Sequence, residues 1–152
     1  AHEYVFLLTK SPRYYYDADA IREPLALTSI GRLQQNIEGQ IGTTRANGGM
    51  KSNGNFKAVG DIEQGRNKRT VWEIATQPYP EAHFATYPEK LVEPCILAGC
   101  PQDGVVLDPF VGSGTTLVVA QRLGRKAIGA DLSAEYLDLA SKRIGRVSLP
   151  MF

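Results

Sequence analysis

The stretch VLDPFVGSGTTLVVA, residues 106–120, decides the fold of this chain of 152 residues. An apolar run leads into Asp108, Gly112 and Gly114 follow, and a helix-forming segment begins directly after them. Glycine lets a backbone approach a ligand closely and tolerates the positive φ angles of a tight turn. The N–H groups at the start of the next helix favour an anionic group. The stretch therefore predicts a strand, a turn and a helix that either hold a nucleotide-like ligand or form a tight connection without one.

The residues around the turn narrow the class of ligand. The dinucleotide fingerprint G-x-G-x-x-G needs a small third residue, and Leu117 stands at that position. The Lys-Ser/Thr ending of a phosphate-binding P-loop is absent. Asp131 closes the next expected strand, where an acidic residue either grips ribose hydroxyls or caps the following helix. These features predict a nucleoside whose anionic group is not a pyrophosphate, and S-adenosylmethionine fits that description.

The second half of the chain alternates between strand and helix patterns, as a parallel α/β sheet requires. Pro94 should kink the first expected helix or shift its start. Ser133 is the expected N-cap of the last helix. The expected strands are 4–9, 70–76, 104–110 and 126–131, and the expected helices are 87–100, 114–124 and 133–144.

Composition excludes several classes of protein. A hydrophobic content of 43% and a charged content of 22% are ordinary for a soluble globular domain. Because no apolar run reaches the length of a bilayer and no signal-peptide pattern is present, we expect a cytoplasmic protein without a membrane partner. The net charge of +1 requires any DNA contact to rest on a local patch. Cys95 and Cys100 fit neither a zinc pair nor a redox motif, so reduced thiols and no metal site are expected.

Residues 108–116, DPFVGSGTT, resemble the D-P-F-x-G-x-G-T-T motif of DNA amino-methyltransferases. These enzymes methylate the exocyclic amino group of cytosine (N4) or adenine (N6). Residues 2–24, 69–96 and 129–144 are similar to further segments of the family, in the order of its circularly permuted β group. The resemblance implies an α/β fold: part of a Rossmann-like, S-adenosylmethionine-dependent methyltransferase sheet with an inserted recognition loop region. It also implies a place in a restriction-modification or phage-type system.

The resemblance implies that S-adenosylmethionine is the cofactor and that one set of residues lines its pocket. Asp131 would hold the ribose, and the residues of the glycine turn would hold the methionine end. The segment before the first expected helix would form the opposite wall. The implied cofactor residues are Phe84, Ala85, Thr86, Asp108, Phe110, Gly112, Gly114, Thr115 and Asp131.

The family's catalytic tetrapeptide, D-P-P-Y or S-P-P-Y, does not occur in these residues, so no catalytic residue is assigned. Asp108 to Phe110 precede the cofactor glycines, where a carboxylate serves binding. The resemblance implies that the chain begins about halfway through an enzyme. We therefore expect the missing N-terminal half of the same enzyme, or a second copy, to cover exposed strand edges. Residues 1–24 look most like members with S-P-P-Y, which favours cytosine N4.

The resemblance divides the chain into 1–24, a strand and linker of the catalytic region, 25–70, a loop-rich target-recognition region, and 71–152, the S-adenosylmethionine-binding α/β region. Double-stranded DNA is the expected partner, although a solvated loop with incidental charge explains the same composition. We expect Trp72 and the tyrosines 14–16 in the core. The expected DNA-contacting residues are Lys51, Lys57, Arg66, Lys68 and Arg69.

Two other interpretations stay open at this stage. One is a catalytically inactive remnant of such an enzyme that binds cofactor or DNA without transferring a methyl group. The other is a nicotinamide dehydrogenase, which Leu117 disfavours because the dinucleotide fingerprint needs a small residue there.

Overall fold

The computed structural model describes residues 2–33, 63, 65–76 and 86–146. By its internal contacts the chain divides into two units, one formed by Ala1–Ile21 with Thr70–Phe152 and the other by Arg22–Arg69. Within the described ranges, no helix is long and apolar enough to cross a membrane.

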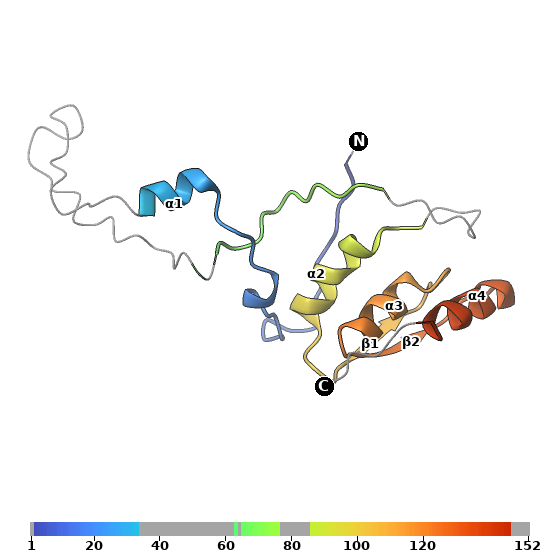
Figure 1. Ribbon diagram of the computed structural model, residues 1–152. Helices are drawn as coiled ribbons and strands as arrows, with labels where there is room; N and C mark the ends of the chain where they lie inside the picture. The colour runs from blue at the N-terminus through green and yellow to red at the C-terminus, as the bar shows by residue number, and fades with distance from the viewer. Residues whose placement is uncertain (1, 34–62, 64, 77–85, 147–152) are drawn as a thin grey trace, which may run out of the picture. The chain divides into compact units, whose positions relative to one another are not determined.

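The first unit is built around two parallel strands joined by a helix (Figure 1). The strands are in register from Val105 opposite Lys126 to Asp108 opposite Gly129. The predicted α/β class with a parallel sheet is confirmed. Its elements are η1 (Asp19–Ile21), α2 (Glu89–Gly99), β1 (Val105–Asp108), α3 (Thr115–Arg122), β2 (Lys126–Gly129) and α4 (Ala134–Ile144).

The core of this unit lies between α2, α3 and one face of the strand pair. Ile96, Cys100, Val119 and Ala120 form its buried cluster, and Val106 and Ala127 of the strands pack against it. Because successive side chains of a strand point to opposite faces, the neighbours of these strand residues lie on the other face.

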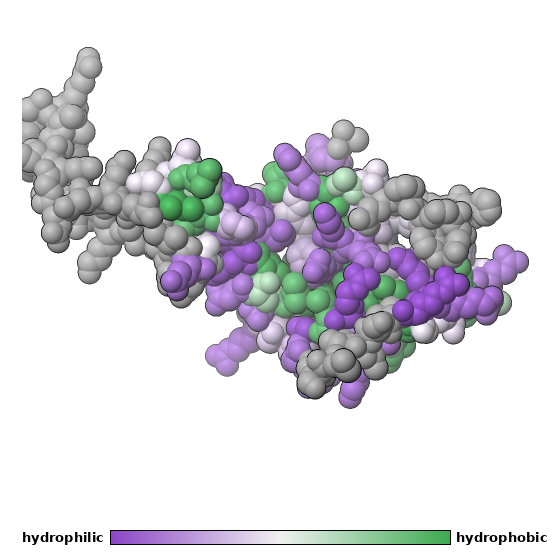
Figure 2. All heavy atoms as spheres, in the orientation of Figure 1, coloured by the Kyte–Doolittle hydropathy of each residue, from purple (hydrophilic) through white to green (hydrophobic). Residues whose placement is uncertain are grey.

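That other face is apolar and exposed to solvent. Val105, Leu107 and Ile128 are 55%, 65% and 57% exposed. Figure 2 shows hydrophobic residues at the surface among hydrophilic ones on the side of the molecule that it presents. One face of the sheet is therefore covered by helices, and its other face is not covered by the described residues.

The helix ends follow the expected chemistry. Ser133 is the N-cap of α4, and its hydroxyl accepts a hydrogen bond from the N–H of Tyr136. Gly124, with a φ of 74°, follows the end of α3 in the left-handed region that favours glycine. Helix α2 begins at Glu89, directly after Pro88, and continues through Pro94. Of the two effects expected of Pro94, a kink or a shifted start, the shifted start is therefore not found.

Three expectations from the first half of the chain were wrong. Residues 4–9 and 70–76 form no strand, and Tyr4 to Leu8 are between 59% and 88% exposed. Tyr14, Tyr15 and Tyr16 are 53%, 47% and 47% exposed rather than in the core, whereas Trp72 is half-buried. An apolar run becomes a strand only when another strand pairs with it. The described residues provide no such partner beside either run.

The second unit contains α1 (Leu27–Leu33) and one antiparallel bridge between Glu23 and Arg66. Residues 34–62 and 64, most of the expected recognition region, lie outside the described residues. Helix α1 was not predicted, because its sequence LTSIGRL contains Thr28, Ser29 and Gly31, which have weak helix propensity.

Candidate functional site

The turn between β1 and α3 has the left-handed backbone that its glycines allow. Gly112 has a φ of 48° and Gly114 a φ of 84°. Val111 donates its N–H to the carbonyl of Ala130 at 2.9 Å, and Gly114 donates to Val111 at 2.8 Å. The turn is thus closed on itself and tied to the residue that follows β2.

The two glycines of the turn differ in what surrounds them. A Cβ on Gly114 would lie 2.9 Å from the Cβ of Ala140, so this glycine allows α4 to pack closely on the turn. A Cβ on Gly112 would meet no atom of the described residues within 4 Å. Gly112 therefore leaves space open beside the backbone, and Gly114 has a packing role.

Asp131 joins the end of the second strand to this turn. Its Oδ2 accepts the N–H of Gly112 at 2.9 Å, and its Oδ1 accepts the N–H of Ser133 at 2.9 Å. The main-chain N–H groups of Ser133 and Gly112 lower the pKa of Asp131, so the carboxylate is charged near neutral pH. Because Ser133 is the N-cap of α4, the alternative reading of Asp131 as that cap is not what the structure shows.

Asp108, at the end of β1, has polar partners from the segment before α2 and from the residues that follow β1. Its Oδ1 accepts the N–H of Phe110 at 3.0 Å. Its Oδ2 accepts the hydroxyls of Tyr87 at 3.1 Å and Thr116 at 2.5 Å. Burial and the neighbouring Asp108 carboxylate raise the pKa of Tyr87, which keeps its hydroxyl protonated. Tyr87 thus attaches the segment before α2 to the strand end.

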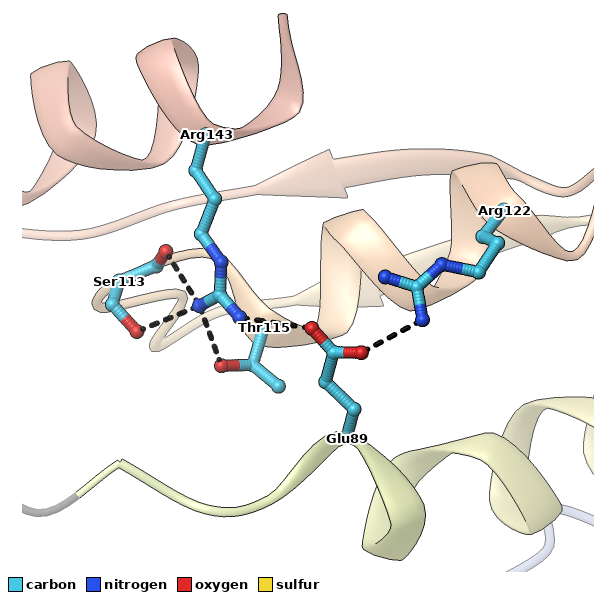
Figure 3. A network of polar contacts seen from close by, with 5 residues as sticks. All are labelled: Glu89, Ser113, Thr115, Arg122 and Arg143. Carbon is cyan, nitrogen blue, oxygen red and sulfur yellow. Dashed lines mark hydrogen bonds and ion pairs between the residues drawn. The ribbon is translucent and has the colours of Figure 1, made fainter. Parts of the chain in front are cut away.

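Arg143, on α4, binds the glycine turn between β1 and α3 (Figure 3). Arg143 donates through Nη1 to the carbonyl and hydroxyl of Ser113, at 3.3 and 3.4 Å, and to the hydroxyl of Thr115 at 3.0 Å. Its Nη2 pairs with Glu89 at 3.1 Å, and Glu89 also pairs with Arg122 at 2.7 Å. Burial alone would raise the pKa of Glu89, but the two arginines hold it below its ordinary value.

Comparison with known proteins gives the family. A family model described as a DNA methylase, of the N6/N4 type, matches residues 1–142. The chain belongs to this DNA methylase family. The predicted resemblance to DNA amino-methyltransferases is therefore confirmed.

Two curated relatives cover nearly all of the chain. It is 39% identical over 146 residues to the type II methyltransferase M.SmaI of Serratia marcescens, a match that covers 96% of this chain and 39% of the relative. It is 40% identical over 144 residues to the type II methyltransferase M.Cfr9I of Citrobacter freundii, with 95% and 36% covered. The chain thus spans less than two fifths of the length of either relative.

Two solved structures are similar to parts of the chain. The M1.HpyAVI–SAM complex is 33% identical with a TM-score of 0.45, and the match covers 51% of this chain and 39% of that one. The PvuII DNA methyltransferase, described as cytosine-N4-specific, is 28% identical with a TM-score of 0.48, and the match covers 54% and 34%.

The structure brings most of the expected cofactor residues to one edge of the sheet. Asp108 is the last residue of β1 and Asp131 follows the parallel strand β2, and the glycines lie between them in the chain. Phe110 is 84% exposed at this edge, whereas Thr115 is buried with its hydroxyl bound to Arg143. Thr86 is half-buried, and Phe84 and Ala85 lie outside the described residues.

Sequence reasoning missed Tyr87, Glu89 and Arg143. Tyr87 had a weak signal, since it directly follows the expected pocket wall at Thr86. No signal in the sequence pointed to Glu89 and Arg143, because charged residues on helices are usually exposed to solvent.

The expected DNA-contacting residues are only partly described. Arg66 and Lys68 each pair with Glu23 at 3.3 Å, and Arg69 is exposed. Burial alone would raise the pKa of Glu23, but Lys68 and Arg66 hold it below its ordinary value. Lys51 and Lys57 lie outside the described residues. DNA contact by this set stays a prediction.

Proposed function

We propose that this chain is the cofactor-binding part of a DNA amino-methyltransferase and that S-adenosylmethionine binds at the turn of residues 109–114. One observation carries the proposal: the N–H of Gly112 is held by Asp131, while the described residues leave the space beside its Cα open. An open backbone position next to a carboxylate at a strand end suits a nucleoside with a charged tail.

The residues of the site fit this cofactor chemically. The carboxylate oxygens of Asp131 accept the N–H groups of Gly112 and Ser133, and a carboxylate of this kind can also accept ribose hydroxyls. Asp108 offers a carboxylate to the ammonium group of the methionine end. The start of α3 offers the main-chain N–H groups and the positive helix end that favour its carboxylate.

When bound, the cofactor supplies an activated methyl group on a sulfonium. The described residues bind and orient the molecule that carries it: Asp131 holds one end, Asp108 and the turn hold the other, and Tyr87 keeps the Asp108 carboxylate in place. Transfer to a base amino group is then largely a matter of positioning. We propose that the whole protein receives a base flipped out of duplex DNA and methylates it at cytosine N4 or adenine N6.

Recognition of the DNA target belongs, in this proposal, to residues 25–70. The basic residues predicted there suit phosphate contacts and base edges. Arg66 and Lys68 are held beside Glu23, which gives them fixed positions in the second unit.

A methyl-transfer assay tests the proposed reaction. The protein as its gene encodes it is incubated with tritiated S-adenosylmethionine and unmethylated duplex DNA, and the labelled nucleosides are separated. The proposal expects label in N4-methylcytosine or N6-methyladenine. Saturable binding of S-adenosylmethionine without label in DNA would instead indicate an inactive remnant, and label in 5-methylcytosine would contradict the proposal.

A further inference from the structure

Arg143 connects three segments that the sequence keeps far apart. Its guanidinium, on α4, reaches Ser113 and Thr115 in the glycine turn and Glu89 at the start of α2 (Figure 3). The side chain of Arg143 is 18% exposed, and Ser113 and Thr115 are 6% and 3% exposed. The contacts are thus largely removed from solvent. Charged hydrogen bonds are stronger in such a partly buried environment than in water.

We propose that Arg143 is a positioning residue that sets the conformation of the glycine turn for cofactor binding. The inference rests on the proposed function, since it assigns a role within the same site. Ser113 stands between the two glycines, so bonds to its carbonyl and hydroxyl fix the chain directly after Gly112. Those bonds help to fix the orientation in which Gly112 donates to Asp131.

Glu89 extends this role to the opposite side of the site. It lies two residues after Tyr87, whose hydroxyl donates to Asp108. The Glu89–Arg143 pair therefore ties the segment that carries Tyr87 to the helix that holds the turn. Arg143 thus sets the distance between the two sides of the proposed pocket.

The guanidinium group is needed for this geometry. Arginine presents several N–H donors in a rigid planar fork, whereas lysine is a single point charge on a flexible stem. Lysine at position 143 would keep the attraction to Glu89 but lose the simultaneous bonds to Ser113 and Thr115. The variant Arg143→Lys therefore tests the hydrogen bonds to the turn while it keeps the positive charge beside Glu89.

Calorimetric titration of S-adenosylhomocysteine into the full chain tests the role of Arg143. We expect Arg143→Lys and Arg143→Gln to weaken binding by about tenfold or more, as loss of charge-assisted hydrogen bonds implies. Arg122→Gln is the matched control, because it removes a pair with the same Glu89 but has no hydrogen bond to the turn. Its affinity should stay within about twofold of wild type.

A second readout separates positioning from stability alone. The amide resonances of Gly112 and Gly114 should shift in Arg143→Lys and stay unchanged in Arg122→Gln. If Arg143→Gln fails to fold, Arg143→Lys decides the question. Wild-type affinity and unchanged glycine resonances in Arg143→Lys, or an equal loss of affinity in Arg122→Gln, would overturn the inference. Absence of binding to the wild-type chain would instead overturn the proposed function.

Discussion

At the scale of single residues, Asp131 accepts main-chain N–H groups from Gly112 and Ser133, which lower its pKa from the ordinary value of 3.8. A lowered pKa in the folded state means that the ionised carboxylate stabilises the fold above the unfolded pKa. This contribution is lost as the pH falls through the folded pKa.

The variant Asp131→Asn tests this linkage. It lacks the charge at every pH, so its free energy of unfolding should fall below that of wild type near neutral pH. The difference should shrink as the pH drops below about 4. Chemical denaturation of both proteins across this range measures the difference. A gap that stays constant with pH would show that the charge of Asp131 does not stabilise the fold.

Local motifs made part of the site predictable at this scale. Asp108, Gly112, Gly114 and Asp131 stand at strand ends and in a turn, where the sequence pattern itself fixes their neighbourhood. Arg143 reaches the turn only because α4 packs against α3, and that tertiary arrangement leaves no mark in the local sequence. Side chains that act across elements therefore required the structure.

At the scale of elements, the two glycines of the turn differ in whether α4 packs against them. Gly114→Ala adds a Cβ 2.9 Å from the Cβ of Ala140 in a left-handed conformation. We expect a loss of about 2–4 kcal/mol in the free energy of unfolding. The Cβ of Gly112→Ala would meet none of the described atoms within 4 Å, so we expect only the backbone cost, about 1 kcal/mol.

Urea denaturation of the two variants and the wild type measures both losses. Gly112→Ala is the control for the cost of a left-handed alanine without crowding. Equal losses in the two variants would show that α4 does not pack on Gly114 as the structure describes.

The strands and helices around the turn were predictable because their sequences and their pairing agree. Strands β1 and β2 are joined by α3, so each finds its partner nearby in the chain. Residues 4–9 have an equally apolar pattern but no strand beside them in the described residues, so they form none. An apolar pattern indicates that a segment can form a strand, but the strand forms only where a partner strand lies beside it.

At the scale of the whole molecule, the uncovered face of the sheet predicts association. Val105, Leu107 and Ile128 are more than half exposed, and exposed apolar patches and open strand edges favour contact with another chain. We expect the 152-residue chain to elute above its monomer mass of 16.6 kDa in size-exclusion chromatography with light scattering. Leu107→Lys should lower the measured mass. A well-folded wild-type monomer would contradict this prediction.

The central claim is that the turn of residues 109–114 holds S-adenosylmethionine, and calorimetric titration of wild type and Gly112→Ala tests it most directly. We predict saturable binding of S-adenosylmethionine to wild type and no saturable binding of NADH. The affinity of Gly112→Ala for S-adenosylmethionine should be at least about tenfold weaker, because its Cβ would enter the open space. The variant should stay folded, because its Cβ would contact no atom of the part of the chain that the structure describes within 4 Å. Absence of binding to wild type, or equal affinity in the variant, would contradict the claim.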